Sequence, residues 1–364
     1  MDLLENTIKK IKPVNDDMDM VIQAHINDLT KPLGALGELE QVAFRFARVN
    51  RQIRPDVPLK RLYTFAADHG VTEQRVSAFP KEVTVQMVAN MLGGGAAINV
   101  FGKHVGCDVR VVDIGVDGDL SEMKGLIHRK VRRGTANMVN AAAMSRSEAV
   151  SAIEVGIDLA NAAAKDGITL IGTGEMGIGN TTPSAALMHV LLPCPLKDIV
   201  GRGTGVDDAG MQRKIDTIRR AVVHHQLTGE NVKDMDPIDV LSRIGGLEIA
   251  GIAGLLLGCA ANGICAVVDG FISSAGALLA CRISPHVADY LFFSHLSAEQ
   301  GHRMFMREMQ LSPLLNLGFR LGEGTGAALA MGLVDASVKM LREMATFSSA
   351  GVSGELEGSD AGAA

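Results

Sequence analysis

Short apolar runs alternate with longer stretches of helical period along the chain from about residue 58 onwards. The runs occupy residues 62–66, 109–114, 168–171, 264–268 and 290–293. Strands of a parallel sheet have this nearly continuous apolar character, because both of their faces are buried. Since the runs alternate with helical stretches, the pattern predicts an α/β fold with a mostly parallel sheet and helices on both faces.

The two ends of the chain lack this alternation. Residues up to about 57 are polar and helical in period, with a glycine-rich turn only around residues 29–40, and they are predicted to form helices outside the sheet. The last residues, from Phe347 to Ala364, are small, polar and aperiodic, which is typical of a frayed tail.

Polar and flexible residues collect around the ends of the predicted strands. They are Asp68, Asp113, the GTGE run at 172–175, Asp269 and the Ser-His pair at 294–295. In open parallel sheets, ligands bind at the carboxyl ends of the strands. Any one aspartate could simply cap a helix, but the repetition indicates a ligand site at this edge of the sheet.

The composition excludes several classes of protein. A formal net charge of −6 does not indicate a nucleic-acid-binding protein, so no nucleic-acid partner is expected. A hydrophobic content of 47% can build a sizeable core, which excludes a disordered or fibrous chain. The 41 glycines are more than usual and indicate tight turns, helix–sheet contacts and ligand cradles.

The cysteines and the apolar segments bear on where the protein works. Five cysteines without a CxxC pair indicate a reducing cytosol rather than a disulfide framework. The charged N-terminus lacks the apolar region of a secretory signal. Residues 249–268 carry no formal charge, but Asn262-Gly263 is predicted to end a helix there, so no membrane span is expected.

The GTGEMG run at 172–177 fits the GxGxxG string of dinucleotide sites and follows a predicted strand. An oxidoreductase is therefore an alternative, although Glu175 lies inside the turn and the helix is predicted to begin only at residues 180–183, where Thr181 or Thr182 can cap it. We favour a glycine-rich loop that leads into a helix N-terminus suited to a phosphate or carboxylate. A glycine turn without a ligand remains the structural alternative.

A second glycine-rich cluster, GRGTGVDD at 201–208, places Arg202 among glycines before an acidic pair. Together with the downstream Lys214, Arg202 could contact an anion. An ordinary solvated loop explains the same pattern equally well.

A third cluster, RLGEGTGAALA at 320–330, places Glu323 between two glycines just before an Ala-rich helix. Flanking glycines leave space for a flat substrate. A carboxylate bordered by Leu321 and apolar helix residues should be partly desolvated, which raises its pKa and makes it a better proton acceptor near neutral pH. The alternative is a glutamate that only stabilises a helix N-terminus.

Metal and nucleotide-hydrolysing motifs do not occur in the sequence. The ten histidines are scattered, with no HExxH or Cys/His zinc spacing, and there is neither a GxSxG elbow nor a GxxxxGK[ST] loop. We therefore expect no catalytic metal and disfavour the hydrolase and P-loop classes.

Eight blocks then carry a resemblance to a known family. In order, they are LTKPLGALGELE at 29–40, ADHGV at 67–71, PKEVTVQM at 80–87, GGGAAIN at 93–99, GTGEMGIGNTT at 172–182, GGLEIA at 245–250, LGEGTG at 321–326 and EMATF at 343–347. Over about residues 29–351, the chain closely resembles the nicotinate-nucleotide–dimethylbenzimidazole phosphoribosyltransferases of cobamide biosynthesis.

The resemblance implies a homodimer with a large Rossmann-like domain and a small helical domain from both chain ends. The expected boundaries are 1–57 with 331–350 for the small domain, 58–330 for the large catalytic domain and 351–364 for a flexible tail. The implied reaction converts nicotinate mononucleotide and a benzimidazole into α-ribazole phosphate and nicotinate, without a cofactor, in the cytoplasm.

The resemblance also implies roles for individual residues. Glu323 takes the position of the catalytic base, Glu175 that of the second active-site glutamate, and Gln86, with Leu321, the aromatic-base pocket. Residues 72–79 lie where pocket residues vary, so the preferred base stays open. Nine residues from the glycine-rich loops, strand ends and helix starts are expected at the phosphate and ribose: Gly174, Gly177, Thr181, Arg202, Gly203, Lys214, Asp269, Ser297 and Arg320.

The runner-up from another class is a non-catalytic nucleotide- or azole-binding protein. Such a protein needs the glycine cradles but no desolvated carboxylate, so Glu323 discriminates between the two readings.

Overall fold

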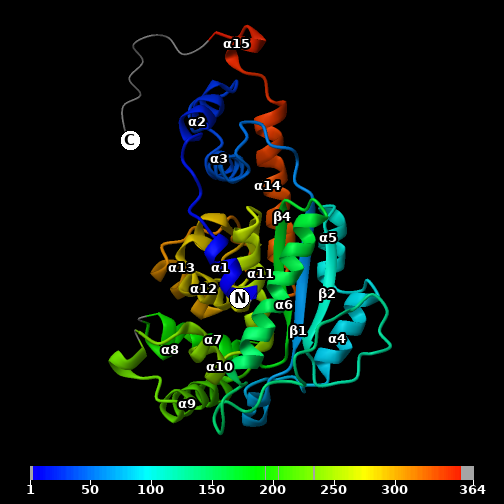
Figure 1. Cartoon of the computed structure of the whole chain (residues 1–364), viewed down its shortest axis with the longest axis vertical. Helices are drawn as coiled ribbons and strands as arrows, with labels where there is room; N and C mark the ends of the chain where they lie inside the picture. The colour runs from blue at the N-terminus through cyan, green and yellow to red at the C-terminus, as the bar shows by residue number, and fades with distance from the viewer. Residues whose placement is uncertain (1–2, 193, 204, 233, 354–364) are drawn as a thin grey trace. The chain divides into compact units, whose positions relative to one another are not determined.

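The computed structural model describes residues 3–192, 194–203, 205–232 and 234–353, in two compact units (Figure 1). The large unit comprises the residues up to Pro13 together with Leu59–Gly332. The small unit comprises Val14–Pro58 together with the residues from Leu333 onwards. The residues of the predicted tail from 354 onwards lie outside the described part of the chain.

The large unit is built on a six-stranded parallel sheet in the order β3-β2-β1-β4-β5-β6. The strands are β1 (Lys60–Ala67), β2 (Asp108–Gly115), β3 (Ile127–His128), β4 (Leu170–Met176), β5 (Cys265–Val268) and β6 (Leu291–Phe293). This is the doubly wound order of a Rossmann-like sheet, so the predicted fold class is confirmed. Its strand order reverses between β1 and β4, where such sheets open a crevice for ligands.

Two strands differ from the sequence-based expectation. The predicted run 168–171 is only the beginning of β4, which continues through Glu175 and Met176. Gly174 pairs with Thr64 of β1, so the GTGEM residues belong to the sheet and do not form the predicted glycine-rich loop. Strand β3 was not predicted, because two residues are too few to produce a pattern.

Helices cover both faces of this sheet in Figure 1, with α4 and α5 on one side and α6 and α11 on the other. The helices of the large unit are α1 (Leu3–Lys10), α4 (Val83–Leu92), α5 (Ala97–His104), α6 (Arg146–Lys165), α7 (Thr181–Leu191), α8 (Leu196–Ile199), α9 (Asp208–His224), α10 (Pro237–Ile244), α11 (Leu247–Ala261), α12 (Phe271–Ile283), α13 (Gln300–Glu308) and the first turns of α14 (Thr325–Glu343). Single 3₁₀ segments occur at Gly70–Gln74, Gly229–Val232 and Pro285–Tyr290.

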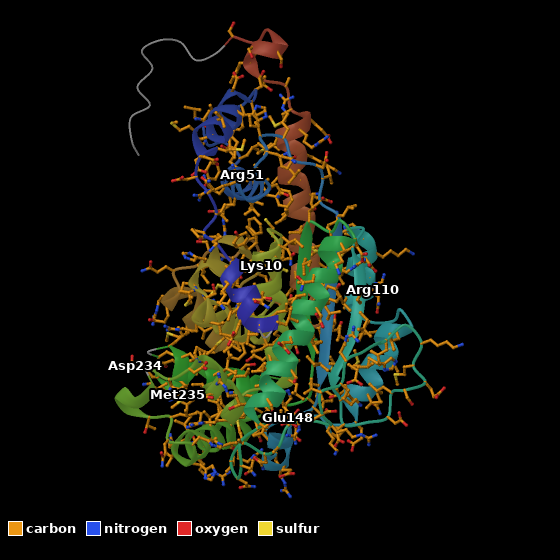
Figure 2. All side chains as sticks on the ribbon, viewed as in Figure 1. Lys10, Arg51, Arg110, Glu148, Asp234 and Met235 are labelled. Atoms are coloured by element: carbon orange, nitrogen blue, oxygen red, sulfur yellow. The ribbon has the colours of Figure 1, made fainter. Side chains whose placement is uncertain are left out.

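Helix α6 illustrates how local sequence sets these elements. Ser145 caps it, because its Oγ accepts from the amide of Glu148 while Glu148 Oε2 accepts from the amide of Ser145 at 2.7 Å. Glu148 is labelled in Figure 2. Helix α11 then packs closely on α6: a Cβ at Gly254 would lie 1.8 Å from the Ile153 carbonyl oxygen. Glycine therefore permits a backbone contact that any side chain would prevent.

The small unit has an apolar core between α2 (Asp19–Asp28), α3 (Glu38–Asn50) and the last turns of α14. Ile22, Ile26, Ala43 and Leu341 are fully buried there. The segment that precedes α15 (Phe347–Ala350) pairs with the end of α2 through a bridge between Leu29 and Thr346. Helices from both chain ends thus share one core.

The first residues of the chain correct the expected division at 1–57. Helix α1, whose end is marked by Lys10 in Figure 2, belongs to the large unit. The amide of Leu4 donates to Glu154 of α6 at 3.3 Å, and the Tyr290 hydroxyl donates to the Lys12 carbonyl at 2.9 Å. The buried Leu4 and Ile11 explain why this segment packs on the α/β unit.

Two apolar segments have a composition that suits a membrane. Residues 249–268 form α11, a turn and β5, as the sequence predicted, and almost all of them are buried. The stretch Val83–His104 is long and apolar enough to span a membrane. However, Gly93–Gly95 divide it into α4 and α5, of 10 and 8 residues, whereas a span needs about 20.

Candidate active site

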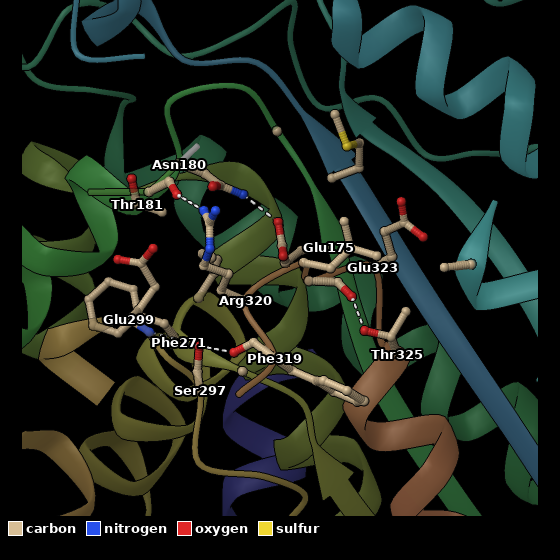
Figure 3. Close-up of a pocket in the computed structure, with 18 of the residues that line it drawn as sticks. Glu175, Asn180, Thr181, Phe271, Ser297, Glu299, Phe319, Arg320, Glu323 and Thr325 are labelled. Carbon is tan, nitrogen blue, oxygen red and sulfur yellow. Dashed lines mark hydrogen bonds between the residues drawn. The ribbon is translucent and has the colours of Figure 1, made fainter. Parts of the chain in front are cut away.

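A cavity of about 710 Å³ lies in the large unit at the carboxyl end of β4. Its lining comes from the end of β4, from α4 and α5, and from the segments around residues 270–272, 295–299 and 319–325 (Figure 3). The cavity therefore lies at the edge of the sheet where the polar residues at the strand ends predicted a ligand site. This is also where the strand order reverses, between β1 and β4.

Glu323 enters this cavity from a strained loop. It has a φ of 62°, in the left-handed region that non-glycine residues avoid, between Gly322 and Gly324, which also have positive φ. Its carbonyl oxygen accepts from the Thr64 hydroxyl at 2.9 Å, and its Oε2 accepts from the amide of Ile98 at 3.3 Å. The loop thus fixes the carboxylate against β1 and α5.

Burial makes Glu323 a good proton acceptor. The residue is only 4% exposed and lines the cavity. Desolvation raises the pKa of its carboxyl group, against the lowering effect of the Ile98 amide. Both properties agree with the role that the sequence predicted for Glu323.

Glu175 reaches the same cavity from β4. Asn180 Nδ2 donates to its Oε2 at 2.5 Å, as Figure 3 shows. Burial raises the pKa of Glu175 to about 8, and the neighbouring charges of Asp269, Glu248 and Glu323 act in the same direction. The raised pKa favours the protonated form of Glu175, which can donate a hydrogen bond as well as accept one.

The wall of the cavity formed by α4 and α5 is apolar. Val83 and Met87 of α4 lie there with Ala97 and Phe101 of α5, and Phe79 and Met176 are close by in the lining. Such a wall suits the face of an aromatic ring. Leu321 lines the cavity, as expected, and is 60% exposed.

Gln86, which was expected in the aromatic-base pocket, does not line this cavity. Its side chain is exposed on α4 and is not among the residues that line the cavity. Val83 and Met87, one helical turn apart, present the face of α4 that the cavity meets. The sequence block was in the right place, but the helix turns Gln86 away.

Polar groups line another part of the cavity. Thr181 stands at the start of α7, whose N-terminal amides and dipole favour an anion. Arg320 lies close to it and donates to the Gly203 carbonyl at 3.2 Å. Ser297 donates to the Phe319 carbonyl at 3.1 Å. Gly177 also belongs to the lining, so five of the nine residues expected at the phosphate and ribose meet here.

The other four expected residues do not line the cavity. Lys214 is fully buried behind it, where Nζ donates to Thr181 Oγ1 at 2.9 Å and to the Gly201 carbonyl at 2.8 Å. Burial lowers the pKa of Lys214 to about 8. Arg202 faces solvent and pairs with Asp208. Lys214 thus holds the loop at Gly201 and the lining residue Thr181 in place, and the expected contact of each cation with an anion stays a prediction.

Asp269 and Gly174 support the loop that carries Glu323. Asp269 accepts from the amides of Gly324 at 3.2 Å and Ala327 at 2.9 Å, so it caps the start of α14. Burial raises its pKa to about 7, although those amides lower it. Gly174 lies under Glu323, where a Cβ would be 2.3 Å from the Glu323 carbonyl oxygen.

Ser297, one of the residues expected at the phosphate and ribose, precedes helix α13, which begins at Gln300. The Ser297 hydroxyl accepts from the amide of Glu299 at 3.3 Å. The Ser297 amide donates to His302 Nδ1 at 2.8 Å, which holds the segment along the cavity wall.

His295 lines the cavity, in agreement with the ligand site that the Ser-His pair at 294–295 indicated. Several other lining residues were missed by the sequence analysis: Asn180, Phe271, Glu299 and Phe319. The closely spaced polar residues in SHLSAEQGH at 294–302 were a signal for Glu299. The aromatic residues gave no signal, because a phenylalanine in a loop reads equally well as core.

Comparisons with known proteins agree with this geometry. A family model described as Phosphoribosyltransferase matches residues 11–352. A nicotinate-nucleotide–dimethylbenzimidazole phosphoribosyltransferase from Geobacter sulfurreducens is 54% identical over 352 residues, which cover 97% of this chain and 99% of that protein. The protein of the same name from Chlorobium chlorochromatii is 53% identical over 355 residues, which cover 98% and 99%.

A solved structure shares the fold. The crystal structure of CobT from Thermus thermophilus superposes with a TM-score of 0.88 at 45% identity and covers 93% of this chain and 99% of that one. The parallel sheet, the buried Glu323 beside an apolar wall and the full-length similarity therefore show that this chain belongs to the phosphoribosyltransferase family.

Proposed function

We propose that the protein transfers the phosphoribosyl group of nicotinate mononucleotide to 5,6-dimethylbenzimidazole or a related base, giving α-ribazole 5′-phosphate and nicotinate for cobalamin synthesis. The observation that carries the proposal is Glu323, a buried carboxylate in the cavity lining between an apolar wall and a helix N-terminus. A strained and desolvated carboxylate costs free energy, and a non-catalytic binding protein would not require one at this position.

The two ends of the cavity suit the two substrates. The α4–α5 wall accepts the flat benzimidazole ring, and Thr181, Gly203, Ser297 and Arg320 accept the 5′-phosphate. Holding both reactants in one orientation converts a bimolecular attack into an effectively unimolecular one, which is worth several kcal/mol.

The leaving group needs neither a general acid nor a metal ion, because its pyridinium ring already carries a positive charge. A base nitrogen attacks the sugar carbon from the face opposite the pyridinium, whose bond breaks and returns the electron pair to nicotinate. This inversion converts the β-linkage into the α-linkage through an oxocarbenium-like transition state, as in inverting glycoside hydrolysis. Nicotinate leaves as a neutral pyridine ring, so no proton has to be supplied to it.

Glu323 removes the proton from the other ring nitrogen of the attacking base. A positioned proton transfer of this kind contributes about 10²–10⁴ in rate. Glu175, held by Asn180, carries a proton near neutral pH and lines the same cavity. We assign to it a hydrogen bond to the substrates, while Glu323 works as the ionised partner.

We also propose a cytoplasmic homodimer. In support, the cysteines at 107, 194, 259 and 281 are free thiols, as a reducing compartment maintains. The resemblance of the chain to the phosphoribosyltransferase family implies the homodimer. Sedimentation at several concentrations tests this, and a monomer throughout would contradict it.

Product analysis tests the activity itself. The purified protein is incubated with nicotinate mononucleotide and, in parallel, dimethylbenzimidazole, benzimidazole and adenine, and each mixture is analysed by mass spectrometry and NMR. We expect an α-linked ribazole phosphate with at least one base. Binding of nucleotide and base without any product would instead support the non-catalytic alternative.

A further inference from the structure

His295 has a role that the reaction scheme above leaves open. It follows β6 and lines the main cavity, although its side chain is almost fully buried. The neighbouring first turn of α14 has a glycine at 326, where a Cβ would lie 2.0 Å from His295 Nδ1. A side chain at position 326 would therefore clash with the imidazole ring, and glycine leaves the space that the ring occupies.

The hydrogen bonds of the ring define its tautomer. Ser294 Oγ donates its only proton to the Asp269 carbonyl at 3.0 Å and also lies 2.9 Å from His295 Nδ1. The second contact then requires that Nδ1 carries the proton and donates it to Ser294. Asp269 Oδ1, 3.9 Å from Nδ1, favours the same tautomer.

This tautomer leaves Nε2 as a lone-pair acceptor. No hydrogen-bond partner of Nε2 occurs among the described residues, and at position 270, where a Cβ would lie 3.5 Å from Nε2, the chain has a glycine with no side chain to offer one. Burial lowers the pKa of His295 to about 4, so the ring stays neutral in the working range of pH. An unpaired acceptor in a cavity calls for a donor on the ligand.

The substrates of the proposed reaction contain few such donors. The base has one ring N–H, which Glu323 must remove, and the phosphate and carboxylate of the nucleotide are acceptors. The two ribose hydroxyls remain. Moreover, His295 and Ser297 both line the cavity, two positions apart in the chain, which lets one nucleotide contact both.

We propose that Nε2 of His295 accepts a hydrogen bond from a ribose hydroxyl of nicotinate mononucleotide and so orients the sugar for attack. The inference rests on the proposed function, because it assigns the ligand from that reaction. Ser294 is then a positioning residue that acts through the tautomer of His295.

The test compares substrates that lack one hydroxyl. Steady-state kcat/KM is measured for the wild type and His295→Ala with nicotinate mononucleotide and with its 2′-deoxy and 3′-deoxy analogues. With the complete nucleotide, we expect His295→Ala to lose roughly tenfold or more. With the analogue that lacks the bonded hydroxyl, the two proteins should agree within about twofold, because the interaction is already gone.

Control variants separate binding from packing. Leu321→Ala, which removes only apolar lining, should lose the same factor with all three substrates. His295→Gln can return an oxygen acceptor near Nε2 and should recover part of the loss. Ser294→Ala removes the group that fixes the proton on Nδ1 of His295. Its loss in kcat/KM should be smaller than that of His295→Ala, but it should again disappear with the analogue that lacks the bonded hydroxyl. This variant tests the inference if His295→Ala does not fold.

Two outcomes are distinguishable. If the wild type forms no product from the complete nucleotide, the proposed function itself fails. If the wild type is active but His295→Ala and His295→Gln each lose equal factors with all three substrates, the function stands and His295 is only a packing residue.

Discussion

Gly174→Ala tests whether β4 positions the loop that carries Glu323, the proposed proton acceptor. The added Cβ would lie 2.3 Å from the Glu323 carbonyl oxygen and 2.8 Å from its carbonyl carbon, whereas ordinary contact begins at 3.4 Å. Both atoms are backbone, so the loop must move away from the strand by about 1 Å, since no side chain can yield in its place. A misplacement of about 1 Å costs about 10²-fold in rate at a site that works by orientation.

The assay is nicotinate release from nicotinate mononucleotide with dimethylbenzimidazole as acceptor. We expect kcat/KM of Gly174→Ala to fall about 100-fold, and its thermal midpoint to fall in line with an overpacking cost of about 1–3 kcal/mol. Thr64→Val is a milder form of the same perturbation, because it removes the hydroxyl that holds the Glu323 carbonyl.

Gly93→Ala is the matched control. It also adds one methyl group near a backbone oxygen, but the nearest atom is 3.4 Å away, so little has to move. This variant should keep nearly wild-type activity. If Gly174→Ala folds and turns over like the wild type, the packing of β4 against the loop does not position Glu323, and the reasoning is refuted.

Three further predictions concern the phosphate, metals and pH. Nicotinate riboside should react with a kcat/KM lower by roughly a hundredfold or more, because remote phosphate contacts contribute to the transition state; equal reactivity would remove the assignment of Thr181 and Arg320. Activity should survive exhaustive chelation, because the leaving group is already a pyridinium; an inactive sample that Mg²⁺ or Zn²⁺ restores would show otherwise. Finally, the pKa of Glu175 is raised from 4.5 to about 8 in the folded protein, so its contribution to stability is complete below about pH 4.5 and is lost as the pH rises to 8. Glu175→Gln should therefore raise the thermal midpoint relative to the wild type more at pH 9 than at pH 5, and a difference that does not change with pH would contradict the assignment.

The sequence predicted the sheet because its strands are apolar on both faces and end at polar residues. It missed the second half of β4, where Gly-Thr-Gly-Glu reads as a loop and becomes a strand only through its pairing with β1. A strand partner about a hundred residues away cannot be found from local pattern.

The candidate site shows the same limit. Glu323 was predictable, because glycines on both sides of a glutamate mark it locally. The outward turn of Gln86 depends on the phase of α4 against the sheet, and the burial of Lys214 depends on how α9 packs behind α7. The proposed role of His295 depends on Ser294, on Asp269 and on the glycine at 326 in the first turn of α14. These residues meet only in the folded chain.

The central claim is that the buried Glu323 carboxylate accepts the proton of the attacking base. Its most direct measurement is kcat/KM of Glu323→Gln with nicotinate mononucleotide and dimethylbenzimidazole near neutral pH, beside a thermal unfolding curve. The amide keeps the shape of the side chain but cannot take the proton, so we predict an intact fold and a loss of roughly 10²-fold or more. A folded variant that retains more than half of the wild-type rate would contradict the account.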